Sequence, residues 1–263
     1  MKKVLLTVTA VLLMLSMLVG CGKTQAETPD VTDPSATLTE PDTTPSVDTI
    51  SAEIKDDVQN QSNASAYADT GYAQQIARYY TALSNQWNEG AYFDNDMSPM
   101  AVYYYEGNAL DNVGFAFLDL DGDNVQELII GAMMNAEKDP LVFEIWTLKN
   151  GEPVMLAQSG ARNRYYSQYA EEDNMWYVAY EAENGAANFA VYYLYLSEGK
   201  FEVIQGILFD AVASENAPWF MAHDLDWDVS NDMPIDEDTA NAVMNAERNN
   251  YTNLEYIPYS LYK

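Results

Sequence analysis

The chain has 263 residues, and its 12 Lys and Arg residues stand against 41 Asp and Glu residues, which gives a formal net charge of −29. This acidity argues against nucleic acid as a partner, because neutralising phosphates requires surfaces rich in Lys and Arg. A single histidine, His223, excludes a zinc site built on paired histidines. The length is sufficient for one or two domains with a sizeable hydrophobic core.

The first twenty residues have the order of a secretion signal. Lys2 and Lys3 precede a mostly apolar run from Val4 to Val19, and this run is short for a stable transmembrane helix. It ends in Leu-Val-Gly-Cys at residues 18–21, which resembles the lipobox of bacterial lipoproteins. The resemblance implies that residues 1–20 are a lipoprotein signal peptide and that Cys21 is acylated and becomes the N-terminus. The alternative is a chance thiol at the end of an uncleaved anchor helix.

Cys21 is the only cysteine of the chain, so no intramolecular disulfide can form. Two acyl chains on one residue supply stable membrane attachment, whereas a single chain is marginal. We therefore expect the protein to be attached to the lipid bilayer through acylated Cys21, on the extracellular face of the cell membrane.

The segment after this cysteine lacks the residues of a folded core. Residues 22–66 contain no aromatic side chain and are dominated by Thr, Ser, Pro, Asp and Glu. Such a segment cannot bury enough apolar surface to offset its conformational entropy. We predict that residues 21–70 form a disordered acidic tether with an end-to-end distance of about 40 Å, and that the folded domain occupies residues 71–263.

The folded domain is expected to begin with a helix. Asp69 and Thr70 are suitable N-caps, and Gly90 is a suitable stop after a helix that runs to about Glu89. The spacing predicts one apolar stripe that packs on the following sheet. This stripe consists of Tyr72, Ile76, Tyr79 or Tyr80, Leu83 and Trp87.

After this helix the apolar period changes to two, which indicates strands. The predicted strands are Ala101 to Glu106, Val113 to Leu118, Glu127 to Met133, Val142 to Lys149, Val154 to Gln158, Met175 to Ala182, Phe189 to Leu196 and Phe201 to Phe209. The pairs Asn150-Gly151 and Asn184-Gly185 are strong hairpin signals, and Ser197 to Gly199 suits a three-residue connection. Successive hairpins predict an antiparallel meander.

A second helix is expected near the C-terminus. It follows Pro234, begins at the acidic triplet that starts with Asp236, and ends before Pro258. Its periodic apolar positions are Ala240, Val243, Met244 and Ala246. The predicted fold class is therefore α+β, a largely antiparallel β-sheet meander with an N-terminal and a C-terminal helix.

The connection between the second and third predicted strands carries the most specific motif of the chain. Counted from Asp119, carboxylates occupy positions one, three, five and nine, at Asp119, Asp121, Asp123 and Glu127, and the carbonyl of Val125 occupies position seven. This spacing allows oxygen ligands to converge on one hard cation, and it predicts bound Ca²⁺. Four carboxylates within nine residues also repel one another without a cation.

The loop differs from an EF-hand. Position twelve, where an EF-hand carries its bidentate Glu, is Ile130. The flanking segments are short, aromatic and β-branched, which is typical of strands and not of the two helices of an EF-hand.

The motif resembles the Asp-x-Asp-Gly-Asp-Gly-x-x-Glu loop of the FG-GAP and VCBS class of extracellular repeats. It is also similar to a stretch found in surface lipoproteins of Gram-positive bacteria of uncharacterised type, and that resemblance implies one calcium loop in a mixed helix and sheet domain from Tyr72 to Tyr262. Asn124 stands where such loops usually carry Gly. Asn tolerates the left-handed conformation that this position requires. The alternative is an acidic turn without metal, in which Asp and Asn bond their own backbone.

A second acidic stretch, Asp224 to Asp232, lacks a turn residue at position six, where Val229 stands, and no apolar strand follows it. We interpret it as an acidic loop that leads into the last helix, with a weak second metal site as the less favoured alternative. Because one calcium loop does not make several blades, the fold is not expected to be a full β-propeller.

No catalytic residue is predicted. His223 neighbours Asp224, but the chain lacks the Gly-x-Ser-x-Gly elbow that would supply a nucleophile. The best local candidates for ligand binding are Arg162, Arg164, Tyr165 and Tyr166, because these arginines are rare cations in an acidic domain. The alternative, which we favour for the aromatic residues, is that they pack in strands.

These observations favour a non-enzymatic, membrane-anchored extracellular lipoprotein with a single structural calcium site. The alternative is a module that binds cell-wall glycan or peptide through exposed aromatic side chains, with calcium as a scaffold. A weaker alternative is an acidic glycosidase, which requires two carboxylates about 5 to 10 Å apart in a cleft. The sequence makes no prediction of the oligomeric state.

Overall fold

The computed structural model describes residues 67–133, 140–171, 174–213 and 216–262. The chain divides into two units, Met1–Thr44 and Pro45–Lys263, and all described residues belong to the second unit. The predicted signal peptide, Cys21 and the tether up to residue 66 lie outside the described residues. Within the described ranges, no helix has the length and apolar character needed to cross a membrane.

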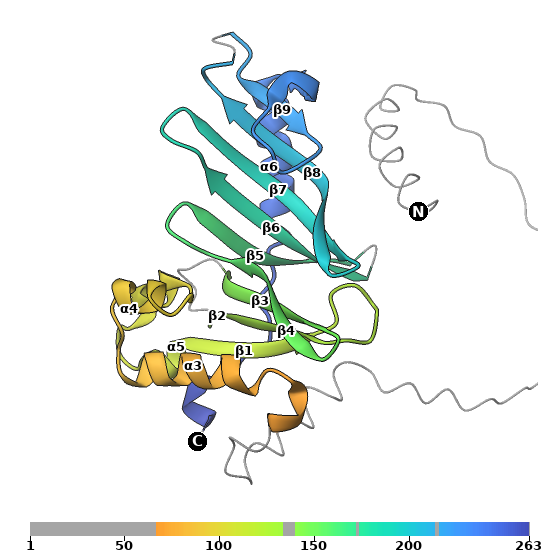
Figure 1. The fold of residues 1–263 in the computed structure, drawn as a ribbon. Coiled ribbons are helices and arrows are strands. Elements are labelled where there is room, and N and C mark those ends of the chain that lie inside the picture. The colour runs from red at the N-terminus through yellow and green to blue at the C-terminus, as the bar shows by residue number, and fades with distance from the viewer. Residues whose placement is uncertain (1–66, 134–139, 172–173, 214–215, 263) are drawn as a thin grey trace, which may run out of the picture. The chain divides into compact units, whose positions relative to one another are not determined.

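The described residues form one open antiparallel sheet with short helices, which confirms the predicted α+β fold class and excludes a full propeller (Figure 1). The strand order is β10-β9-β8-β7-β6-β5-β3-β2-β1-β11, and β4 pairs with β3 beside this path. The strands are β1 (Val113–Leu118), β2 (Glu127–Ala132), β3 (Leu141–Lys149), β4 (Glu152–Gln158), β5 (Asn163–Ala170), β6 (Met175–Glu183), β7 (Asn188–Ser197), β8 (Lys200–Asp210), β9 (Trp219–Ala222), β10 (Met233–Ile235) and β11 (Ile257–Pro258).

Strand β3 joins the two parts of this sheet. One edge of β3 pairs with β4 along most of its length, and the beginning of the same edge pairs with β5 at Val142 and Tyr165. Ser159, which is 1% exposed, lies between these two pairings. Its hydroxyl donates to the carbonyl of Val142 at 2.5 Å and accepts from the backbone N–H of Tyr165 at 3.0 Å. These bonds hold β5 against β3 where only a short backbone ladder connects them.

The described helical segments are η1 (Ala68–Thr70), α3 (Ala73–Ser84), α4 (Glu89–Phe93), η2 (Pro99–Tyr104), α5 (Ala109–Asn112), η3 (Val229–Asn231), α6 (Glu237–Arg248) and η4 (Tyr259–Leu261). The C-terminal helix α6 is confirmed, and Asp236 caps it by accepting from the backbone N–H of Thr239 at 2.6 Å. The folded part also begins before the predicted boundary at residue 71, because Tyr67 is 3% exposed and packs edge-on against Phe115.

The predicted extent of the first helix is wrong at both ends. Asp69 and Thr70 belong to η1, and Tyr72, which makes no side-chain capping bond, precedes the first residue of α3. Helix α3 ends at Ser84, and the chain reverses through Gln86, which has a φ of 47°. The backbone N–H of Trp87 then bonds to the carbonyl of Ala82 at 3.0 Å, which is the six-to-one bond of a Schellman cap. Because Gln86 and not Gly takes the left-handed position, the sequence carries no stop signal there. Gly90 lies inside the separate helix α4.

The predicted strand Ala101 to Glu106 is also wrong, because these residues belong mainly to the 3₁₀ helix η2. Ser98 caps this helix with its hydroxyl, which accepts from the backbone N–H of Met100, and Pro99 occupies the first turn. Met100, Ala101 and Tyr104 are buried on one side, so tertiary packing overrides the strand preference of the aromatic run.

Strand β5 was not expected, because its residues are largely polar. Ser167 and Gln168 are nevertheless buried, and their side chains bond to the segment after α6 and to Glu247 of α6. The short strands β9, β10 and β11 were also not expected, since each has four residues or fewer.

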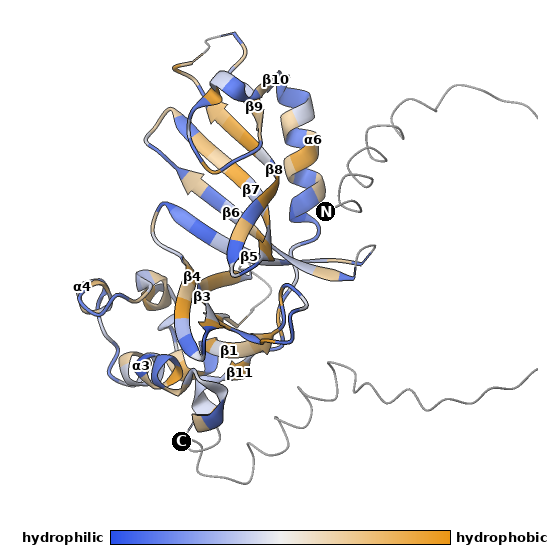
Figure 2. Cartoon of the chain, turned by 45° about the vertical axis from the view of Figure 1, so that its right-hand side comes forward, coloured by the Kyte–Doolittle hydropathy of each residue, from blue (hydrophilic) through white to orange (hydrophobic). Residues whose placement is uncertain are grey.

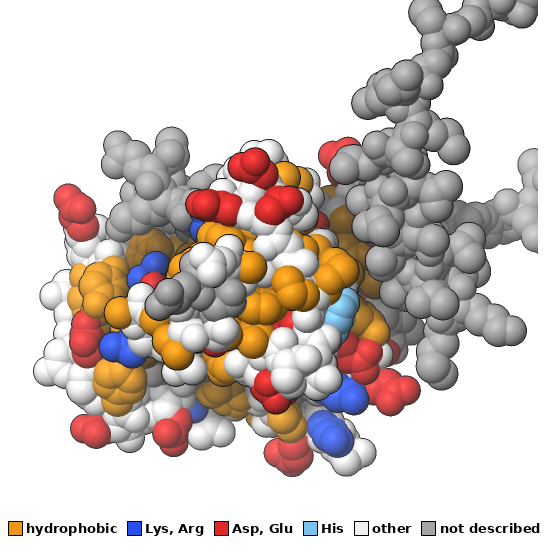
Figure 3. All heavy atoms as spheres, turned by 90° about the horizontal axis from the view of Figure 1, so that it is seen from above, with side chains coloured by type: hydrophobic (Ala, Val, Ile, Leu, Met, Phe, Trp, Pro, Cys, Tyr) orange, Lys and Arg blue, Asp and Glu red, His pale blue; other side chains and the backbone are white. Residues whose placement is uncertain are grey.

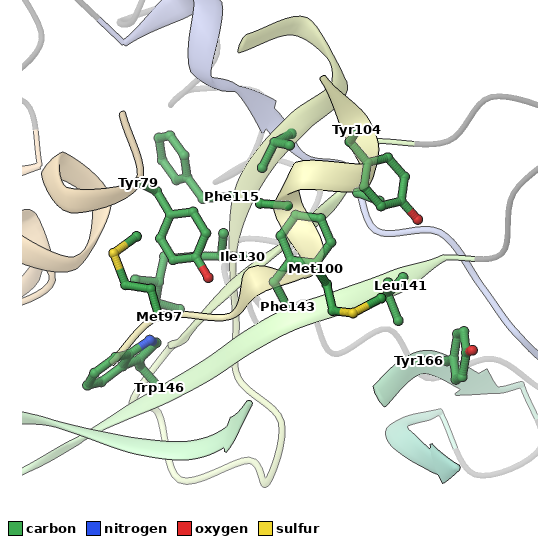
Figure 4. Packing of buried hydrophobic residues seen from close by; sticks show 14 of the residues in the cluster. Tyr79, Met97, Met100, Tyr104, Phe115, Ile130, Leu141, Phe143, Trp146 and Tyr166 are labelled. Atoms are coloured by element: carbon green, nitrogen blue, oxygen red, sulfur yellow. The ribbon is translucent and has the colours of Figure 1, made fainter. Parts of the chain in front are cut away.

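Each face of the sheet carries a buried hydrophobic cluster. On one face, a cluster contains Tyr79 of α3, Met100 of η2, Phe115 of β1 and Phe143 of β3 (Figure 4). The same cluster includes Met244 of α6. Figure 2 shows α6 lying along strands of the upper part of the sheet. A second cluster on the opposite face includes side chains from β1 to β3 and from β6 to β9.

Candidate metal centre

The acidic loop occupies residues 119–126, between β1 and β2. Leu118 and Glu127 are partners in the antiparallel ladder, so Glu127 begins β2 directly opposite the last residue of β1. This confirms the predicted order of strand, acidic loop and strand. It also differs from an EF-hand, whose calcium loop joins two helices.

The loop is closed by hydrogen bonds from its own backbone. The two carboxylate oxygens of Asp119 accept from the N–H groups of Gly122 at 2.7 Å and Asn124 at 3.0 Å. Asp121 accepts from the N–H of Asp123 at 3.3 Å. Asn124 has a φ of 69°, as expected for a residue that replaces Gly in a sharp turn.

Three of the predicted side chains converge. Asp119, Asp121 and Glu127 each present one carboxylate oxygen, and these oxygens lie within 4.8 Å of one another. Two oxygens on opposite sides of a calcium ion lie about 4.6 to 5.2 Å apart, twice the usual Ca–O distance. The donor set therefore fits one hard cation. Asp123 is exposed and outside this group, and its carboxylate accepts from the N–H of half-buried Val125 at 2.7 Å.

Glu127 is the buried member of the group, with 1% of its surface exposed. Its carboxylate accepts from the backbone N–H of Leu120 at 2.9 Å and from the hydroxyl of Thr147 at 2.9 Å. Burial nevertheless raises the pKa of Glu127 to about 7, and repulsion by Asp121 and Asp123 adds to the rise.

The pKa of Asp121 is shifted in the same direction as the pKa of Glu127. Burial, followed by repulsion from Asp123, raises the pKa of the Asp121 carboxyl above its ordinary value. The ionised forms of Glu127 and Asp121 are therefore less favoured than in water, and a divalent cation would counteract this by attracting both carboxylates.

Two residues far away in the sequence support the loop and were not predicted. Thr147 of β3 bonds to Glu127, and the hydroxyl of Tyr72 donates to the carbonyl of Gln126 at 2.9 Å. Both side chains are buried. A Thr inside the mostly apolar strand β3 is a weak sequence signal for such a role, whereas Tyr72 gives none.

The second acidic stretch has a different geometry. Asp224, Asp226 and Asp228 each accept from the backbone N–H two residues ahead, at 2.8 to 3.2 Å. Within the described residues, the only convergent group of three acidic or other metal-ligating side chains is the one at Asp119. The stretch joins the antiparallel partners β9 and β10, so the expectation that no apolar strand follows it is wrong. The interpretation of residues 224–232 as an acidic loop without metal stays a prediction.

The predicted ligand-binding residues Arg162, Arg164, Tyr165 and Tyr166, which lie at and just before the beginning of β5, do not all face one site. Arg162 and Arg164 line one pocket of about 170 Å³. Tyr165 points to the opposite face, because successive strand residues alternate, and its ring stacks on Tyr180 with 4.5 Å between centroids. Tyr166 is 5% exposed and packs in the core. The two tyrosines are therefore packing residues and do not form an exposed platform.

Comparison with known proteins finds no matching family model, no matching curated protein and no matching solved structure. A fold by itself does not define a function. The function is therefore inferred from the chemistry and geometry of the sites described above.

Proposed function

We propose that this chain is a non-enzymatic extracellular lipoprotein, anchored to the cell membrane through acylated Cys21, whose domain binds one structural calcium ion at the β1–β2 loop. Asp119, Asp121 and Glu127 are the side-chain ligands. Asp123 and the carbonyl of Val125 are the further predicted ligands, and water completes the coordination on the exposed side. The observation that carries the proposal is the convergence of three carboxylates within 4.8 Å at the point where two strands part.

The position of the loop supports a structural role for the proposed ion. Glu127 is simultaneously the closing carboxylate, the first residue of β2 and the acceptor for Thr147 of β3. An ion held by Glu127 and Asp119 therefore connects the end of β1 to the beginning of β2. It also offsets the repulsion among carboxylates, and this effect stabilises only the folded chain.

The expected affinity is modest. Extracellular calcium modules commonly have dissociation constants of about 10⁻⁴ to 10⁻³ M. At ten times the dissociation constant, binding to the folded state alone adds about 1.4 kcal/mol to the free energy of unfolding.

Thermal unfolding of the full chain with calcium and with a chelator tests this proposal. We expect calcium to raise the midpoint of unfolding, and Asp121→Asn to remove most of this increase. Asp228→Asn is the matched control, because Asp228 is an exposed carboxylate in the second acidic stretch. An unfolding midpoint that is the same with calcium and with chelator contradicts the proposal.

The alternative of an aromatic cell-wall binding platform is less well supported. Among the described residues, the exposed large aromatic side chains are Phe93 at 61% and Tyr103 at 57%, whereas most other rings are buried or half-buried. Buried rings are the arrangement expected for packing residues. The weaker alternative, an acidic glycosidase, would use Glu181 and Glu183, which line one pocket, but Glu181 already bonds to Arg248.

A further inference from the structure

A pocket of about 170 Å³ lies on the sheet where α6 ends. Its lining includes Arg162, Arg164, Glu181, Glu183, Phe189 and Arg248. Arg164 and Glu181 are partners across β5 and β6, and Glu183 and Phe189 are partners across β6 and β7. Their side chains therefore share one face, and Arg248 reaches the same face from the last turn of α6.

Positive charge is concentrated at this pocket. The described residues include six basic side chains, and three of them line the pocket. The six are Arg78, Lys149, Arg162, Arg164, Lys200 and Arg248. On the face seen in Figure 3, basic side chains lie at several separate places among more numerous acidic ones. The pocket is thus an exception in an acidic protein.

The three arginines differ in their partners. Arg248 forms an ion pair with Glu181 at 2.9 Å, and the hydroxyl of Tyr251 also donates to this carboxylate at 3.4 Å. Within the described ranges, neither Arg162 nor Arg164 forms an ion pair. Both are exposed, and the guanidinium of Arg164 has one long hydrogen bond, to the carbonyl of Ala161 at 3.4 Å. Arg162 and Arg164 therefore keep most of their donors for a ligand.

We propose that this pocket binds the carboxylate group of a small organic acid through Arg162 and Arg164. A guanidinium presents a planar fork of donors that matches a carboxylate, and such charge-assisted bonds are strong. The half-buried ring of Phe189 lies beside these arginines and supplies an apolar surface for the organic part of the ligand. The ion pair with Glu181 holds Arg248 at the rim.

Charge and size define the ligand further. Three arginines and two glutamates leave one net positive charge at the pocket, which a singly charged carboxylate balances. A doubly charged phosphate exceeds this charge, and Glu181 and Glu183 repel it more strongly than a singly charged carboxylate. The volume corresponds to about six molecules of liquid water, so the pocket admits an acid of a few heavy atoms or the carboxyl end of a longer molecule.

The proposal does not depend on calcium, and the two are tested separately. The full chain is first freed of calcium by dialysis, so that no polycarboxylate chelator is present, and is then titrated calorimetrically with N-acetylalanine, glucuronate, N-acetylalaninamide and inorganic phosphate. We expect at least one of the two carboxylates to bind, and the uncharged amide and phosphate to bind at least tenfold more weakly. Preference for N-acetylalanine assigns a peptide-type carboxylate, and preference for glucuronate assigns a sugar acid.

Variants complete the test. We expect Arg164→Gln to weaken carboxylate binding about tenfold, whereas Lys200→Gln, which removes one positive charge at the β7–β8 turn, leaves binding unchanged. Unchanged unfolding midpoints show that both variants are folded. The proposal is overturned if neither carboxylate binds at millimolar concentration, if the amide or phosphate binds as tightly, or if the two variants weaken binding equally.

Discussion

The carboxylate of Glu127 accepts a hydrogen bond from the hydroxyl of Thr147 at 2.9 Å, although the two residues are 20 positions apart in the sequence. This bond connects the closing residue of the acidic loop to β3, the strand that joins the two parts of the sheet. The proposed calcium site and the sheet are therefore mechanically coupled through one buried carboxylate.

Replacing Thr147 with Val should show how much the hydrogen bond between Thr147 and Glu127 contributes to the stability of the fold. Val keeps the shape of Thr but leaves one oxygen of buried Glu127 without its donor, which costs about 1 to 3 kcal/mol. We expect Thr147→Val to lower the free energy of unfolding by this amount in a denaturant titration. Thr81→Val, at an exposed position of α3, should change it by less than about 0.5 kcal/mol. Equal effects of the two substitutions contradict the proposed support of Glu127.

The pH dependence of stability should differ with and without calcium. Burial raises the pKa of Glu127 from 4.5 to about 7 in the metal-free fold, so the folded state binds this proton more tightly than the unfolded state. The resulting stability is fully present below about pH 4.5 and is lost as the pH rises through about 7.

Denaturant unfolding of the chelated full chain between pH 4.5 and 8 measures this loss. We expect saturating calcium to reduce the decline, because the ion favours the ionised carboxylate, and Glu127→Gln to remove it from the chelated protein. Parallel pH profiles for wild type and Glu127→Gln, both in chelator, are the contrary result.

The conformation of Asn124 should limit which residues this position accepts. Its φ of 69° lies in the left-handed region, where a side chain branched at Cβ costs at least about 1 to 2 kcal/mol. We expect Asn124→Val to weaken calcium binding about tenfold and Asn124→Gly to preserve it. Calcium titration of both variants checks this, and equal affinities contradict the proposed role of the turn.

The sheet itself is tested at Gly131 of β2. A Cβ atom at this residue would lie 2.8 Å from the carbonyl oxygen of Leu141 and would also meet the hydroxyl of Tyr256. We expect Gly131→Ala to lower the free energy of unfolding by about 1 to 3 kcal/mol. A Cβ atom at Gly160 meets nothing within 4 Å, so Gly160→Ala should be nearly neutral in the same denaturant titration. Equal stability of the two variants contradicts the close packing of Tyr256 against Gly131.

Local signals predicted much of the sheet. The Asn-Gly pairs at residues 150–151 and 184–185 place two hairpins correctly, because their turns require residues that tolerate positive φ. The predicted order of strand, loop and strand around Asp119 follows from apolar runs that enclose a turn. The predictions were wrong where tertiary packing overrides the local preference, as in η2, whose aromatic residues are typical of a strand.

In the candidate sites, too, residues with local sequence signals were predictable, whereas residues placed by long-range packing were not. The carboxylates of the loop are recognisable from their spacing, since all lie within nine residues. Thr147, Tyr72 and Arg248 could not be assigned to the two sites, because long-range packing brings each of them there. Arg162 and Arg164 are recognisable from the sequence as rare cations, but the common face of Arg164 and Glu181 depends on the register between β5 and β6.

Direct calcium binding is the most decisive measurement for the proposed function. A calorimetric titration of the chelated full chain with CaCl₂ should give one site with a dissociation constant of about 10⁻⁴ to 10⁻³ M. Asp121→Asn should abolish the heat of binding, and Asp228→Asn should leave it unchanged. No binding heat at 10 mM calcium, or the same heat from the wild type and Asp121→Asn, contradicts the proposed calcium site.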